Sequence, residues 1–128
     1  MDCLILSKID FNNIASHPIP EYLLKRLQRV QLAAAGFVLG RYAHIKMPDL
    51  IKLGWMPIKE RRGYQLLNTV FKALNYNDWP SYLKLDIHNP TRTLRSSKET
   101  TLKIRLEWGT FQHSASNVFN SLPSAARN

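Results

Sequence analysis

The residues of this chain that could do chemistry are its cations, which fall into three short clusters. The clusters are Lys25, Arg26 and Arg29, then Lys59, Arg61 and Arg62, then Arg92, Arg95 and Lys98. Lys and Arg side chains bind the phosphate backbone of nucleic acids without reading its base sequence. The hydroxyl side chains interspersed in the third cluster could add further phosphate ligands. The alternative is an ordinary solvated surface for the first cluster and a disordered basic linker for the third.

The second cluster lies close to Trp55, and this proximity allows two interpretations. An aromatic ring beside arginines can stack on a base while the guanidinium groups hold phosphate. Alternatively, Trp55 anchors a core at the turn that it forms with Pro57. We favour the core because large aromatic side chains contribute mainly through burial.

Metal-dependent or nucleophilic chemistry is not indicated by the residues present. The metal ions of phosphoryl transfer need paired carboxylates, whereas the aspartates stand isolated at Asp2, Asp10, Asp49, Asp78 and Asp86. The histidines are not spaced as zinc ligands, and the chain has a single cysteine. It also has neither a glycine-rich phosphate loop nor a nucleophile elbow. We therefore expect no catalytic residue, no metal and no other cofactor.

Composition and charge describe a globular, basic protein. Of the 128 residues, 45% are hydrophobic and 21% are charged, and the formal net charge is +9. Residues 21–78 carry ten basic and four acidic side chains. An excess of this size favours a polyanionic partner, of which nucleic acid is the commonest. On charge alone, a surface that is merely basic is an equal alternative.

No segment has the sequence of a membrane or secretory element. Apolar runs are far shorter than the roughly 18 residues that a membrane helix needs, and an acidic residue precedes the short apolar run at the N-terminus. A lone cysteine fits a reducing compartment. We expect an intracellular protein of the nucleus or cytoplasm, without a membrane partner.

Hydrophobic periodicity predicts a mainly α fold, a small helical bundle of two long amphipathic helices with short helices. The first long helix runs from Glu21 to about Leu39, and the second from about Pro57 to Asn75. Each carries an apolar stripe at helical spacing that should form its buried face. The stripes are Leu23, Leu27, Val30, Ala34 and Phe37 in the first helix, and Tyr64, Leu67, Phe71 and Leu74 in the second.

Shorter elements are predicted around these helices. They are short helices at 3–14 and 48–53, a helical turn at 79–85, a strand at 102–106, a terminal helix starting near 111, and a frayed tail at 124–128. The predicted domains are a helical region, residues 1–85, and a smaller C-terminal extension, residues 86–128, with a basic loop, the short strand and the terminal helix.

Residues 27–31 (LQRVQ) and 54–61 (GWMPIKER) resemble the segment that follows the polymerase core in non-LTR retrotransposon reverse transcriptases of the jockey-like group. In that family an LQRVQ helix is followed by a turn of the form WLP(V/I) and a further helix. Other segments that resemble the family, in the same order, are residues 7–13, 64–67, 71–74, 80–83, 92–97 and 111–123.

The resemblance implies a thumb-like region, which in the family grips the template–primer duplex behind the active site. RNA and DNA, bound without sequence preference, are then the expected partners, and the upstream palm domain of the polymerase is a further one. The family's Tyr/Phe-Ala-Asp-Asp motif is not in this chain, so the resemblance implies a non-catalytic C-terminal portion of an RNA-directed DNA polymerase.

Two alternatives stay open, a helical protein-interaction module and an inactive transposon relic with no selected activity. The surface of the first helices should discriminate between them. A region that packs on a larger polymerase should expose an apolar patch of roughly several hundred Å². An independent module should cover that face.

Overall fold

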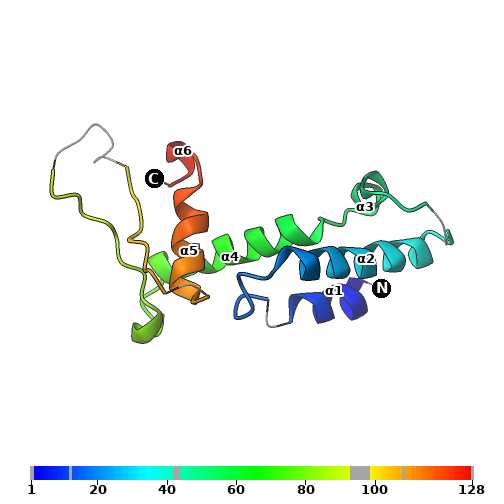
Figure 1. The fold of residues 1–128 in the computed structure, drawn as a ribbon, viewed down its shortest axis with the longest axis horizontal. Coiled ribbons are helices and arrows are strands. Elements are labelled where there is room, and N and C mark those ends of the chain that lie inside the picture. Colours follow the sequence, from blue (N-terminus) through cyan, green and yellow to red (C-terminus); the bar gives the residue numbers. More distant parts are fainter. Residues whose placement is uncertain (1, 12, 42–43, 93–98, 108, 128) are drawn as a thin grey trace. The chain divides into compact units, whose positions relative to one another are not determined.

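The computed structural model describes residues 2–11, 13–41, 44–92, 99–107 and 109–127. The elements in chain order are α1 (Asp2–Asp10), α2 (Glu21–Val38), α3 (Met47–Lys52), α4 (Ile58–Asn75), the 3-10 turn η1 (Ser81–Leu83), α5 (Phe111–Asn120) and α6 (Ser124–Arg127), as Figure 1 shows. The predicted mainly α class, with two long helices, is confirmed.

Contacts divide the chain into two units, Met1–Tyr64 and Gln65–Asn128, with the division inside α4. The sequence had suggested a division near residue 85. The division lies earlier because the second half of α4 contributes Val70 to the core of the second unit, where it packs with Leu102, Ala115 and Phe119.

In the first unit, α1 lies alongside α2, and α3 packs against α2 (Figure 1). The core consists of Leu6, Ala34, Ala35, Leu50 and Trp55. Small side chains at the end of α2 permit this close packing. A Cβ atom at Gly36 would lie 2.5 Å from the carbonyl oxygen of Arg41.

The ends of α2 and α3 explain why Trp55 is buried. Each helix ends in a glycine with positive φ, Gly40 at 64° and Gly54 at 72°, which turns the chain back over the last helical turn. In α3 the Trp55 N–H then donates to the Leu50 carbonyl at 2.9 Å. The indole consequently joins the core beside Leu50 and is 4% exposed. The interpretation of Trp55 as a core residue is confirmed.

The buried face of α2 differs from the predicted stripe. Val30 and Phe37 are 55% and 57% exposed, whereas Gln31, Ala34 and Ala35 are buried. The predicted stripe was wrong at Val30 and Phe37 but right at Ala34, because periodicity gives weight to large apolar side chains. The observed contact uses small residues, which allow close approach, and one amide.

The buried face of α4 also differs from the predicted one. Tyr64 and Phe71 are 63% and 62% exposed, and the buried positions that follow Ile58 are Arg62, Leu66 and Val70. The predicted face of α4 was therefore wrong at Tyr64 and Phe71. Three positions spaced four residues apart, one of them an arginine, give no clear apolar stripe in the sequence.

The predicted strand at residues 102–106 was also wrong, because the described residues contain only an isolated bridge between Ile87 and Leu102. The Asn120 amide accepts from the Leu102 N–H and donates to the Leu102 carbonyl, both at 2.9 Å. Ser116 Oγ donates to the Lys103 carbonyl at 3.1 Å. Side chains of α5 thus bind the backbone groups that a neighbouring strand would otherwise occupy.

The C-terminal segment is helical rather than frayed. Within α6 the Arg127 side chain is 10% exposed and donates to Glu99 Oε2 at 2.7 Å. This ion pair holds α6 to the segment that precedes α5, and the predicted frayed tail was wrong for residues 124–127.

The corrected face of α4 can be tested by two neighbouring substitutions. Val70→Ala removes two fully buried methyl groups and should lower the free energy of unfolding by about 1–3 kcal/mol. Phe71→Ala, although it removes a larger side chain, should change it by about 0.5 kcal/mol or less because the ring is exposed. Urea unfolding followed by circular dichroism measures both. A larger loss for Phe71→Ala would restore the predicted stripe.

Candidate nucleic-acid interface

Two glutamines of α2 connect this helix to the start of α4. Gln31 is fully buried, and its Nε2 donates to the Met56 carbonyl at 2.8 Å. Gln28 Nε2 donates to Gln31 Oε1 at 2.8 Å, and Gln28 Oε1 accepts from the Ile58 N–H at 3.0 Å. The first N–H groups of a helix have no partner within it. Gln28 therefore caps α4 from a different helix.

This cap determines which cations come together. Lys25 lies one turn before Gln28 on α2, and Lys59 directly follows the capped Ile58. Lys25 and Lys59 line one hollow of about 190 Å³ together with Glu21 and Glu60. The structure thus joins one residue from each of the first two predicted clusters, and places two carboxylates beside them.

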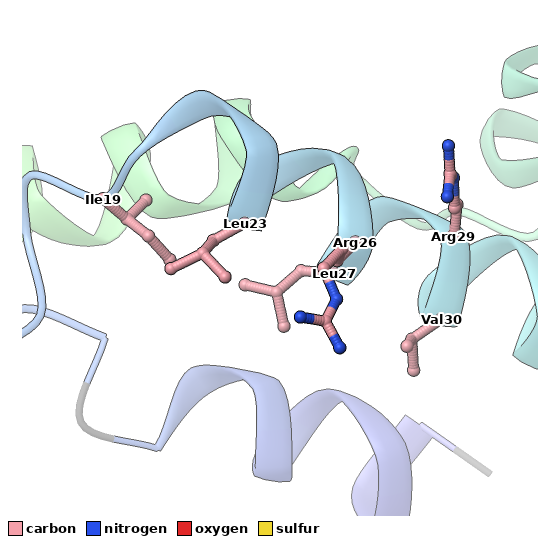
Figure 2. Close-up of a pocket in the computed structure, with 6 residues that line it drawn as sticks. All are labelled: Ile19, Leu23, Arg26, Leu27, Arg29 and Val30. Atoms are coloured by element: carbon pink, nitrogen blue, oxygen red, sulfur yellow. The ribbon is translucent and has the colours of Figure 1, made fainter.

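The cations of α2 point in different directions. Lys25, Arg26 and Arg29 are exposed, and none of them forms a salt bridge with an acid in the described part of the chain. In Figure 2 the guanidinium of Arg26 lies on the side of α2 that faces α1, whereas Arg29 extends in the opposite direction. The first predicted cluster therefore lies on more than one face of α2.

Arg61 and Arg62, predicted as phosphate ligands, take part in internal contacts. Arg61 Nε donates to Asp10 Oδ1 at 2.7 Å, and its terminal nitrogen bonds the second oxygen of that carboxylate. Arg62 is 5% exposed and donates to the carbonyls of Asn13 and Ser16 at 3.1 and 3.3 Å. Arg61 thus holds the end of α1 to α4, and Arg62 holds the segment that follows α1 to α4.

His17 lies in the same region, next to the Arg62 side chain. Burial, followed by the charge of Arg62, lowers the pKa of the His17 imidazole. Burial also lowers the pKa of Arg62, but its guanidinium stays protonated at neutral pH. Among the described residues, His17 Nδ1 has no hydrogen-bond partner. His17 is thus a neutral imidazole beside a buried cation.

The third cluster is only partly described. Arg92 is exposed, whereas Arg95 and Lys98 lie outside the described residues. No group of three or more metal-ligating side chains is placed to hold an ion in the ranges that the structure describes. Within those ranges, too, no helix has both the length and the apolar character needed to cross a membrane.

Sequence reasoning missed the roles of Gln28, Gln31 and Arg62. The small residues at 33–36 (AAAG) were the available signal for a close helix contact near Gln31. A polar side chain beside such a contact is expected to be buried and hydrogen-bonded. No comparable signal marks Arg62, because its partners are backbone carbonyls.

Comparisons with protein-family models, curated proteins and solved structures give no match for this chain.

The glutamine network should contribute measurably to stability. Gln31→Leu fills a similar volume but leaves the Met56 carbonyl and the Gln28 amide without their partner, which should cost about 1–3 kcal/mol. Gln112→Leu is the matched control, because Gln112 also donates to a backbone carbonyl, but through a hydrogen bond that is exposed to solvent. The control should cost about 0.5 kcal/mol or less. Equal losses in chemical unfolding would contradict the role of the network.

Stability should also depend on pH through His17. In the unfolded chain this imidazole titrates near its ordinary pKa of about 6.5, and in the folded chain at a lower pKa. The unfolded state consequently binds more protons as pH falls below about 6.5, so stability decreases there. His17→Phe removes this component, and its melting temperature should fall less between pH 7.5 and pH 5 than that of the wild type. His88→Gln, at an exposed position, should behave like the wild type.

Proposed function

We propose that this chain binds nucleic acid without sequence preference, as a thumb-like, non-catalytic part of an RNA-directed DNA polymerase. The phosphate-binding surface consists of Lys25 and Arg29 on α2 and Lys59 on α4. One observation carries the proposal: the Gln28 cap holds the start of α4 against α2, so that Lys25 and Lys59 stand at one hollow.

The geometry of these cations suits a phosphate backbone. Arg29 follows Lys25 by one helical turn, which separates their Cβ atoms by about 5–6 Å. Each strand of duplex DNA carries one phosphate per about 3.4 Å of helix axis, so neighbouring phosphates lie within reach of two long, flexible side chains. Both cations are exposed on a helix that the core holds in place, and cations on a rigid element can follow phosphates without base contacts.

The two segments that carry the resemblance also contact each other. Gln28 and Gln31 belong to the LQRVQ run, and their partners Met56 and Ile58 belong to the segment that follows Trp55. This buried hydrogen-bond network requires the glutamines of the LQRVQ run and the backbone groups of the segment after Trp55 to be present together. This dependence is a physical reason for the two segments to occur as a pair, and it supports the proposed kinship.

The surface of the first helices also supports a region that packs on a larger assembly. Leu4 and Phe11 near α1 are 71% and 83% exposed, and Val30 of α2 is exposed too. These residues, with partly buried neighbours, line one continuous hollow. An exposed apolar face was the feature expected of a polymerase portion rather than of a self-contained module.

Salt dependence of binding tests the phosphate-binding surface. Binding by counterion release gives a log–log slope of about −0.9 per phosphate neutralised on duplex DNA. The variant Lys25→Ala/Arg29→Ala/Lys59→Ala should therefore flatten the slope on an RNA–DNA hybrid by up to about 2.7 units, if each cation contacts one phosphate. Fluorescence anisotropy at several salt concentrations measures the slope.

Two controls sharpen this experiment. Glu21→Gln/Glu60→Gln removes the carboxylates beside Lys25 and Lys59, so it should strengthen binding rather than weaken it. Arg61→Gln should leave the slope unchanged, because this arginine is paired with Asp10. Identical slopes for the wild type and the triple variant would overturn the proposed surface, and absence of binding at low salt would overturn the function.

A further inference from the structure

We propose that the groove between α1 and α2 binds an amphipathic α-helix of another polypeptide, with apolar side chains on one face and Asp or Glu along its flanks. This inference specifies what covers the apolar face of the first helices described above, and it does not depend on phosphate binding by Lys25, Arg29 and Lys59. Figure 2 shows the α2 wall of the groove, where Leu23, Leu27 and Val30 extend toward α1.

The floor of the groove is apolar and accessible. It comprises two adjoining hollows of about 450 and 440 Å³, which share Ile19, Leu27 and Val30. Leu4 and Phe11 contribute the α1 side. Apolar side chains as exposed as Phe11, at 83%, mark a contact surface when they gather in one concave region rather than singly.

The charges around the groove have one sign. Lys8 of α1 and Arg26 of α2 line the hollows from opposite walls, and the buried Arg62 lies at the inner side. Arg29 borders one hollow but extends away from α1. None of the described residues that line either hollow is acidic. An apolar floor between two cationic walls is complementary to a helix whose apolar stripe is flanked by carboxylates.

The dimensions favour a helix of a few turns. Phe11 follows Leu4 by seven positions, and Val30 follows Ile19 by eleven. At a rise of about 1.5 Å per helical residue, the groove is roughly 10–16 Å long. This length accommodates two to three turns, which place side chains at i, i+3 or i+4, and i+7 on the floor. A third helix packed between two others is the ordinary way in which an exposed interhelical groove is covered.

Two other occupants fit the groove less well. A phosphate backbone would satisfy Lys8 and Arg26 but would place charge over the apolar floor, without a gain from burying Leu4 or Val30. An anionic membrane is attracted by cations, but a flat bilayer surface cannot enter a concavity between two helices as a convex helix does. The protein helix satisfies the floor and both walls.

The test uses the full chain and two designed peptides of about 16 residues. Both peptides have leucines at i, i+3 or i+4, i+7 and i+11; one has glutamates on its flanks and the other lysines. In fluorescence anisotropy at fixed salt, the acidic peptide should bind at least about tenfold more tightly than the basic one. Equal affinities would overturn the proposal, because the floor alone would then account for binding.

Charge reversal on the walls is the second arm. Lys8→Glu/Arg26→Glu changes exposed side chains and should invert the preference, so that the basic peptide binds more tightly. Lys25→Glu/Lys59→Glu makes the same change of net charge outside the groove, and it should retain the preference for the acidic peptide. If both pairs lower acidic-peptide binding equally, attraction to overall charge replaces the groove as the explanation.

The third arm removes the floor without changing charge. Phe11→Ser/Val30→Ser alters two exposed positions, so the fold should persist by circular dichroism while acidic-peptide binding is lost. Binding of the RNA–DNA hybrid should not change, which separates this inference from the proposed function. Retained peptide binding would overturn the proposal.

Other occupants give their own results. If the hybrid or phosphatidylserine vesicles displace the acidic peptide from the wild type, and the same ligand no longer binds Phe11→Ser/Val30→Ser directly, the groove would be assigned to that ligand instead. Sedimentation that shows a dimer in the wild type and a monomer in this variant would assign it to a second copy. Failure of the acidic peptide to bind would also overturn the proposal.

Discussion

The first unit depends on the hydrogen bonds that Gln28 and Gln31 make across the start of α4. An apolar contact tolerates sliding, whereas an amide whose partners are specific backbone groups does not, because each misplacement leaves a buried polar atom unpaired. Gln31 binds the Met56 carbonyl and Gln28 the Ile58 N–H, two groups on either side of Pro57. The pair thereby fixes where α4 begins relative to α2, and with it the position of Lys59.

Features set by local chemistry could be predicted from the sequence. Helical periodicity located α2 and α4 within a residue or two, since an amphipathic pattern sustained over 18 residues fits no other element. Gly40 and Gly54 lie where α2 and α3 end, because the left-handed conformation found there favours glycine. The burial of Trp55 followed from its size and its place in a turn.

Features set by contacts between distant residues could not be predicted in this way. The buried faces of both long helices were misplaced because the contacts involve Gln31, Ala35 and Arg62, whose types usually indicate a solvent face or carry no clear signal. The predicted strand was wrong for a related reason. Apolar residues do alternate with polar ones at 102–106, but Asn120, 18 residues further on in α5, binds the backbone of Leu102. Side-chain amides that replace a strand leave no period in the sequence.

Formal charge, for the same reason, does not locate a partner surface by itself. Several of the cations that make the chain basic are engaged with acids or carbonyls of the fold, among them Arg61, Arg62 and Arg127. Their charge contributes to the overall field, while their guanidinium groups form contacts within the fold. The cations of α2 differ because the helix is held from within by amides and small side chains rather than by ion pairs. The contacts that hold α2 in place therefore leave three cations exposed, Lys25, Arg26 and Arg29. For this reason α2 is the element most suited to face a partner.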